Sequence, residues 1–187
     1  MIFNNKKNKK NKKKKGFSLV EALISITILM ISVAAPLKLA GDGINSTSIA
    51  EQQIVAFYLT QDAMEYVKNI KTNNRLSHED ITTGLDKCNI DIPPNRGCRI
   101  DTVSGSIAMC SVGCVNGVLR FDENTGMYNY NNGNPHSIFT RQVKIFPKRT
   151  DPVTSAVLEM QVEVSTKWTS INNQPQEYKL KANLLDW

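Results

Sequence analysis

The feature that most constrains this chain is a positively charged segment near its N-terminus that is followed closely by an apolar one. Residues 1–15 contain eight lysines and no acidic residue, and the sixteen residues 22–37 carry no charge and are mostly apolar. A basic segment followed by an apolar run is typical of a membrane-directing segment whose lysines stay in the cytoplasm. The 21 residues 17–37 would form about 31 Å of helix, which matches a bilayer core. The sequence therefore predicts one anchor in the cytoplasmic (inner) membrane.

One carboxylate, Glu21, stands at the start of the apolar run. Burying an ion in hydrocarbon costs several kcal/mol, so an acidic residue in this position indicates a functional role. The alternative is that Glu21 reaches the membrane interface, where it would favour the positive end of the helix dipole. These residues alone leave the two interpretations equal.

The residues before Glu21 carry a motif, Lys15-Gly16-Phe17-Ser18-Leu19-Val20-Glu21, which resembles the processing site of type IV prepilins and pseudopilins. The resemblance implies that a dedicated membrane enzyme, prepilin peptidase, cuts after Gly16 and methylates the new amine of Phe17. It also implies that Glu21 pairs with the N-terminal amine of an adjacent subunit. Two opposite charges inside an apolar helix bundle are stabilised most when they pair with each other.

Three further segments resemble, more loosely, the V-type minor pilins and the I-type minor pseudopilins of type II secretion. They are residues 22–27, 63–69 and 162–168. The resemblance implies a structural subunit and not an enzyme, assembled through its N-terminal helix into a pilus or pseudopilus by a cytoplasmic ATPase machine. The implied partners are the inner membrane, prepilin peptidase and other pilin or pseudopilin subunits.

The net charge of +6 belongs to the leader. Removing its eight lysines from the 23 basic residues leaves 15, against 17 acidic residues, or −2 for the rest of the chain. A lysine-rich run can also mark nucleic-acid binding, but its position before an apolar segment favours the membrane. No nucleic-acid contact is predicted.

Helical character continues beyond the apolar run. Pro36 should kink the helix, and Gly41 and Gly43 each weaken it by about 1 kcal/mol relative to alanine. The pattern then resumes, with apolar residues at steps of three and four on one face: Ala56, Leu59, Ala63, Tyr66 and Ile70. We expect the helix to stop at Asn73-Asn74.

The C-terminal third has the clearest strand pattern. Residues 158–168 alternate strictly between inward and polar positions, as in a half-buried antiparallel strand. Residues 139–146 and 178–184 are expected to pair with it, and residues 118–121 and 127–130 to form a hairpin. Such a sheet needs a cover, and the amphipathic helix of residues 49–70 is the candidate. The predicted fold class is α+β, a long N-terminal helix packed on a C-terminal antiparallel sheet, and it resembles the pilin fold.

These patterns divide the chain into four segments. We expect a basic leader (1–16), a transmembrane and assembly helix (17–40), its amphipathic continuation (41–74), and a β-rich head outside the cytoplasm (75–187).

The four cysteines, Cys88, Cys98, Cys110 and Cys114, lie within 27 residues. An even cluster in an exported domain predicts two disulfides. Four cysteines allow three connectivities. We favour Cys88–Cys98 with Cys110–Cys114, because each loop is local and contains turn-forming residues. A zinc site is the rival interpretation, but the C-x9-C and C-x3-C spacings and the lack of a nearby histidine disfavour it. No metal or cofactor is predicted.

No catalytic grouping is evident. His78 and His136 are isolated in polar loops, and Asp122 with Asn124 forms a turn better than a fragment of a calcium loop. Two alternatives stay open. One is a membrane-anchored extracytoplasmic binding module that does not polymerise. The other is a secreted protein cut after Ser32-Val33-Ala34, which Glu21 before the apolar run and the strong helical pattern beyond Ala34 disfavour.

Overall fold

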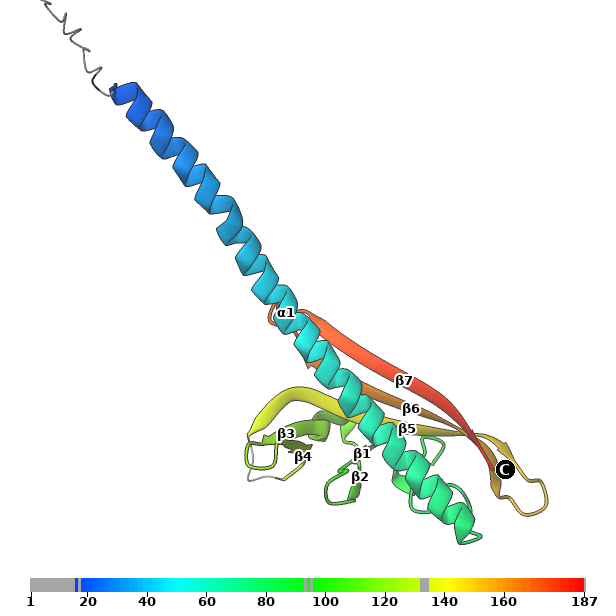
Figure 1. The fold of residues 1–187 in the computed structure, drawn as a ribbon. Coiled ribbons are helices and arrows are strands. Elements are labelled where there is room, and N and C mark those ends of the chain that lie inside the picture. The colour runs from blue at the N-terminus through cyan, green and yellow to red at the C-terminus, as the bar shows by residue number, and fades with distance from the viewer. Residues whose placement is uncertain (1–15, 17, 93, 95, 132–134, 187) are drawn as a thin grey trace, which may run out of the picture. The chain divides into compact units, whose positions relative to one another are not determined.

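The computed structural model describes residues 16, 18–92, 94, 96–131 and 135–186. The chain divides into two compact units, Met1–Ile44 and Asn45–Trp187. Helix α1, Leu19–Leu76, begins in the first unit and ends in the second (Figure 1). It includes Pro36, as the continuous helical pattern on both sides of this residue predicts.

The second unit contains one seven-stranded antiparallel sheet. Three long strands form its main part: β5 (His136–Thr150), β6 (Val157–Thr169) and β7 (Pro175–Leu185). Strand β6 lies between β5 and β7, and the other side of β5 pairs with β1 (Cys98–Ile100) and β3 (Val118–Asp122). Strands β2 (Ile107–Met109) and β4 (Met127–Asn129) pair with β1 and β3. Two short 3₁₀ helices, η1 (Asp86–Cys88) and η2 (Val112–Gly117), connect these elements.

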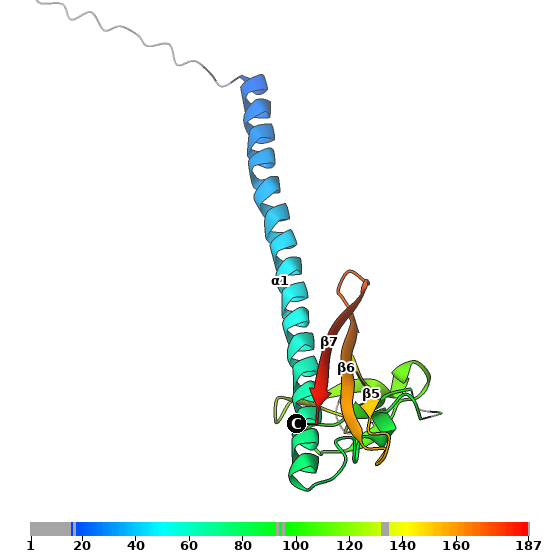
Figure 2. The ribbon, with the colours of Figure 1, turned by 90° about the vertical axis from the view of Figure 1, so that its right-hand side faces the viewer.

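The C-terminal half of α1 covers one face of this sheet (Figure 2). The predicted alternation along β6 is confirmed, because its inward residues are buried: Met160, Val162, Val164, Thr166 and Trp168. They pack against buried helix residues, of which Ala56, Leu59 and Ala63 were predicted. Met64 and Val67 are also buried, whereas the predicted Tyr66 and Ile70 are partly buried. The predicted α+β class is therefore confirmed, since each apolar face is buried by the other.

The end of α1 differs from the prediction. The helix ends at Leu76 and not at Asn73-Asn74. His78 takes a left-handed conformation with φ of 58°, and the Glu79 N–H then donates to the Asn74 carbonyl at 2.8 Å. Helices usually end in this way with a glycine in the left-handed position. Because a histidine takes that position here, the sequence did not indicate where the helix ends.

The strands also run further than predicted. Strand β5 extends beyond residues 139–146 at both ends and includes Pro147. Proline has no N–H to donate to a neighbouring strand, so it is tolerated where a strand pairs on one side only. At Pro147 strand β5 pairs only with β6, through Met160. Strands β1 and β2, three residues each, had no recognisable pattern of their own, whereas the predicted β3–β4 hairpin is present.

Candidate functional site

The N-terminal site begins just before helix α1. Gly16 is exposed and lies outside the helix, which starts at Leu19. A Cβ added at Gly16 would meet no atom within 4 Å, so nothing in the chain itself blocks access to this backbone. Phe17 and the leader residues 1–15 lie outside the described residues.

Glu21 lies in the first turn of α1 and is exposed. Its backbone carbonyl accepts a hydrogen bond from Ser25 Oγ at 2.7 Å. Within the described part of the chain no hydrogen bond or ion pair reaches its carboxylate. The carboxylate is therefore available to a group from outside this chain, and it also lies near the positive end of the helix dipole.

The segment that follows is suited to lipid. Among the described residues, α1 is the one helix long and apolar enough to cross a membrane, and none of its most apolar window is buried. Its hydroxyl groups are satisfied internally, because Thr27 and Ser32 each donate to a carbonyl three residues earlier, at 2.8 Å. A hydroxyl bonded in this way adds no unsatisfied donor in hydrocarbon.

Residues 11–35 match the family described as the prokaryotic N-terminal methylation motif. This region includes Gly16, Phe17 and Glu21 and ends inside the apolar helix. This match supports the assignment of the chain to the type IV prepilin and pseudopilin family. No match was found among the curated proteins or among the solved structures. The motif and the apolar helix of this chain together fit a single-pass membrane protein.

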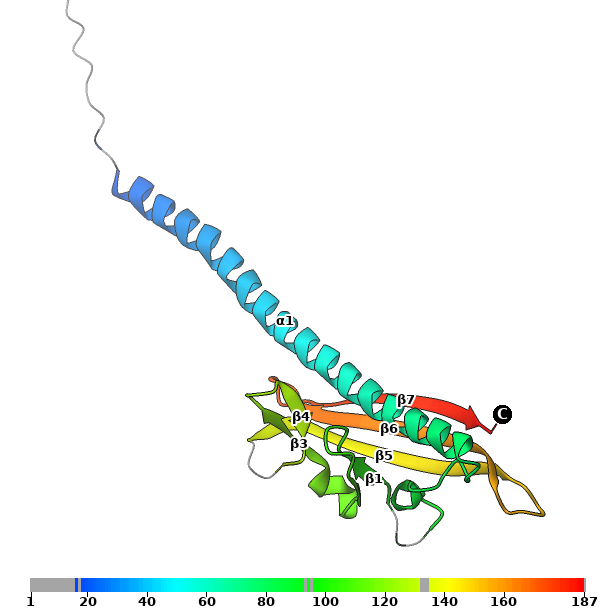
Figure 3. The same ribbon diagram turned by 60° about the horizontal axis from the view of Figure 1, so that its bottom comes forward.

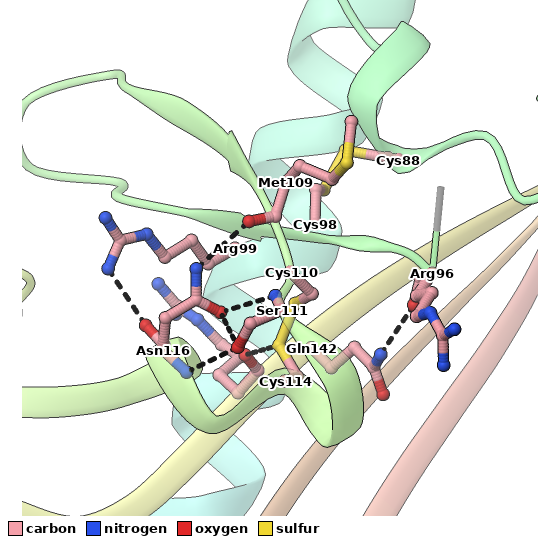
Figure 4. The surroundings of a disulfide bond; sticks show 11 residues. Cys88, Arg96, Cys98, Arg99, Met109, Cys110, Ser111, Cys114, Asn116 and Gln142 are labelled. Atoms are coloured by element: carbon pink, nitrogen blue, oxygen red, sulfur yellow. Dashed lines mark hydrogen bonds between the residues drawn. A yellow bond between two sulfur atoms is a disulfide. The ribbon is translucent and has the colours of Figure 1, made fainter. Parts of the chain in front are cut away.

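The four cysteines of the chain form two local pairs. Cys88 pairs with Cys98 and Cys110 with Cys114, with Cα atoms 4.5 and 4.6 Å apart (Figure 4). These are the two pairs favoured from the sequence. All four side chains are buried, and the Cys110 N–H donates to the Gly97 carbonyl at 2.9 Å. Both pairs therefore lie at the open end of the β1–β2 hairpin, away from its turn.

Asn116 holds the loop between Cys110 and Cys114 in place. Its Oδ1 accepts hydrogen bonds from the Ser111 N–H and hydroxyl, and its Nδ2 donates to the Met109 carbonyl at 3.0 Å. Its own carbonyl accepts from Arg99 at 2.9 Å (Figure 4). The loop is therefore held by side-chain hydrogen bonds in addition to the pairing of Cys110 with Cys114.

We expect peptide mapping of the non-reduced protein by mass spectrometry to find Cys88 linked to Cys98 and Cys110 linked to Cys114. Closing the Cys88–Cys98 loop, with a sequence separation of 10, should stabilise the head by about 2.5–3 kcal/mol through loop-closure entropy. Serine at both positions would test that value by chemical unfolding. Four free thiols would contradict an oxidising compartment, whereas a Cys88–Cys114 link would contradict only the pairing.

A buried arginine that the sequence analysis missed joins the helix to the sheet. The Arg141 side chain is fully buried, and its Nη1 donates to the Leu59 carbonyl at 2.9 Å and to Asp62 Oδ2 at 3.0 Å. Its Nη2 donates to the Ile100 carbonyl of β1 at 2.6 Å. The sequence pattern does indicate that Arg141 is buried, because it alternates with Phe139, Val143 and Ile145 on the inward side of its strand.

Aromatic and polar groups enclose this arginine. Burial raises the pKa of the Tyr130 phenol, and the nearby Arg141 cation opposes that shift. The Tyr130 ring also lies against the Arg99 guanidinium, 5.1 Å from its centroid. Thr102 donates to Asp62 Oδ2 at 2.7 Å, so the same carboxylate oxygen joins α1, β5 and the β1–β2 turn.

The remaining candidates form no catalytic group. His78 is exposed at the end of α1, and His136 is hydrogen-bonded to Arg120 at 2.9 Å. Asp122 accepts the Asn124 N–H at 3.0 Å, which is the turn arrangement. No cluster of three or more metal-ligating side chains occurs among the described residues.

Proposed function

We propose that this chain is the precursor of a minor type IV pilin or pseudopilin, a structural subunit and not an enzyme. The lysine leader stays in the cytoplasm, the helix enters the cytoplasmic membrane, and the head lies outside the cytoplasm. Prepilin peptidase then cuts after Gly16. The cleaved chain assembles with other pilin or pseudopilin subunits into a pilus or pseudopilus.

One observation carries the proposal: the methylation motif at residues 11–35 leads directly into an apolar helix that this chain leaves uncovered. Exposed apolar surface costs about 25 cal/mol for each Å² left in water. The membrane covers that surface before assembly, and helices of neighbouring subunits cover it afterwards. The looser resemblance of residues 22–27, 63–69 and 162–168 to minor subunits supports the minor assignment.

The test is the N-terminal residue of the protein recovered from membranes. A methylated Phe17 supports the proposal. Ala35 at the N-terminus would indicate a secreted protein, and an intact Met1 would indicate a plain anchor on a binding module that does not polymerise.

Replacing Gly16 with leucine should leave full-length protein in the membrane, because a peptidase needs close access to the backbone at this position. Insertion should persist, since the apolar helix is unchanged. The measurement is the mass of the membrane-bound protein. Gly41→Ala is the matched control, because its position is equally open and lies in the same unit. Normal maturation of the Gly16 variant would show that the cut is elsewhere.

A further inference from the structure

A groove lies on the head where the C-terminal half of helix α1 passes the start of β7, and we call it the α1–β7 groove (Figure 3). It has a volume of about 590 Å³, which falls in the range of about 300–1,000 Å³ typical of small-molecule sites. All the residues that line it belong to the second compact unit. The groove is therefore a feature of the head and does not depend on the membrane segment.

Four aromatic side chains line the α1–β7 groove: Phe57, Tyr58, Trp168 and Tyr178. The Phe57 ring meets the rings of Tyr58 and Tyr178 edge to face, with centroids 5.4 and 5.5 Å apart. Tyr58 is 64% exposed, so much of its ring is open to a ligand. The face of an aromatic ring is partly negative and attracts the weakly positive C–H groups of an apolar surface. The groove therefore suits a ligand with a flat face of C–H groups.

Polar groups without partners lie among these rings. Gln53 and Gln176 line the groove, and within the described part of the chain no hydrogen bond reaches either side-chain amide. Trp168 is the least exposed of the four aromatic residues, at 6%, and its Nε1 has no acceptor among the described residues. A buried indole N–H usually has one. The groove therefore offers two free amides and lacks an acceptor, which suits a ligand that carries hydroxyl groups.

The α1–β7 groove has no charge left to pair. Among the described residues that line it, Glu177 is the one charged side chain, and none is basic. The Glu177 carboxylate already lies 3.8 Å from the ammonium groups of both Lys167 and Lys179. An ionic ligand would lose its hydration without gaining a counter-charge here. The groove therefore favours an uncharged ligand.

Two kinds of uncharged ligand suit an aromatic groove, a proline-rich segment and a sugar. A proline-rich segment presents backbone carbonyl groups but few N–H donors, so it would leave the amide oxygens of Gln53 and Gln176 unpaired. A pyranose with equatorial substituents presents C–H groups on its faces and hydroxyls at its edge. Each hydroxyl can both donate and accept, as each amide can. The sugar therefore matches the rings and the amides together.

We propose that the α1–β7 groove binds an uncharged pyranoside, whose ring stacks on Tyr58 and whose hydroxyls bond to Gln53 and Gln176. The chain would then bind a neutral glycan through its head in addition to serving as a structural subunit. The inference does not rest on cleavage or assembly, because the groove shares no residue with the motif at residues 11–35.

The test is calorimetric titration of the full-length protein in a detergent that has no sugar headgroup. The probes are cellobiose and N,N′-diacetylchitobiose, which are both uncharged and carry equatorial ring substituents. Mannitol is the control compound, because this open-chain polyol has the hydroxyls without the flat apolar face. We expect saturable binding of at least one disaccharide in the millimolar range and no binding of mannitol.

Two variants locate the site. Tyr58→Ala and Gln53→Leu should each weaken disaccharide binding by about two- to twelve-fold, the range for losing one aromatic contact or one hydrogen bond. Both residues are exposed, so the stability of the head should change little. Met127→Ala is the matched control and should leave binding unchanged. Met127 is exposed and lies with Tyr58 in a different groove on the other side of that residue, so this variant separates the two grooves.

Failure of either disaccharide to bind the native protein overturns the inference, as does equal binding of mannitol. Unchanged affinity in both the Tyr58 and the Gln53 variants would place the sugar elsewhere and also overturns it. Binding of a decaproline peptide without binding of either disaccharide would show that the groove takes a polypeptide instead. None of these results bears on the cut after Gly16, which the N-terminal residue of the membrane-bound protein tests separately.

Discussion

Glu21→Ala should insert and be cleaved normally while it incorporates poorly into filaments. In a single membrane-inserted chain, Glu21 is exposed in the first turn of α1 and can stay hydrated at the interface. In a bundle of helices it loses that water, and an amine on a neighbouring subunit is the group that can offset the loss. Removing one partner of a buried pair costs about 3–5 kcal/mol, which is more than a hundredfold in an equilibrium constant.

The experiment compares the cleaved protein in membranes with the protein in sheared filaments. Glu21→Gln should be nearly as poor as Glu21→Ala, because it keeps the shape and removes the charge. Asp42→Asn is the matched control, since it removes another carboxylate of the same unit outside the motif. Normal incorporation of both Glu21 variants would leave the family fold standing and remove charge pairing as the mechanism. A muted effect would indicate a subunit with few neighbours, as at a filament tip.

Arg141→Ala should destabilise the head by about 3–5 kcal/mol. The substitution leaves a cavity between helix and sheet and takes the donor away from the buried Ile100 carbonyl. It also removes the only hydrogen bonds that hold Asp62 and the Leu59 carbonyl to β5 among the described contacts. Because the guanidinium joins α1 to two strands, its loss should loosen the helix from the sheet and not merely weaken one contact.

The measurement is chemical unfolding of the full-length protein in detergent, followed by tryptophan fluorescence, since Trp168 is buried in the head. Arg141→Lys should fall between the alanine variant and the native chain, because one ammonium lacks the fork that spans both carbonyls. Arg149→Ala on the same strand is exposed and should change the free energy of unfolding by no more than about 0.5 kcal/mol. Equal stability of the Arg141 and Arg149 variants would contradict the role assigned to Arg141.

Several features of this chain were predictable because their causes are local. The basic leader, the apolar run and the motif from Lys15 to Glu21 are contiguous, so each can be recognised without a fold. The helix face and the alternation on β6 follow the periods of 3.6 and 2 that secondary structure imposes. The favoured cysteine pairs close short loops, which is why proximity in sequence pointed to the pairs that the structure forms.

The tertiary structure decided what depends on residues far apart in the chain. Arg141 and Asp62 are 79 positions apart, and Thr60 donates to Thr166 across 106, so no local period could pair them. The sequence determined the long helix, the apolar segment, the β3–β4 hairpin and the positions of the three long strands, because those states follow from neighbouring residues. The fold decided which polar groups meet in the interior, because burial makes an unpaired donor or charge costly and only the packed chain shows which partner is within reach.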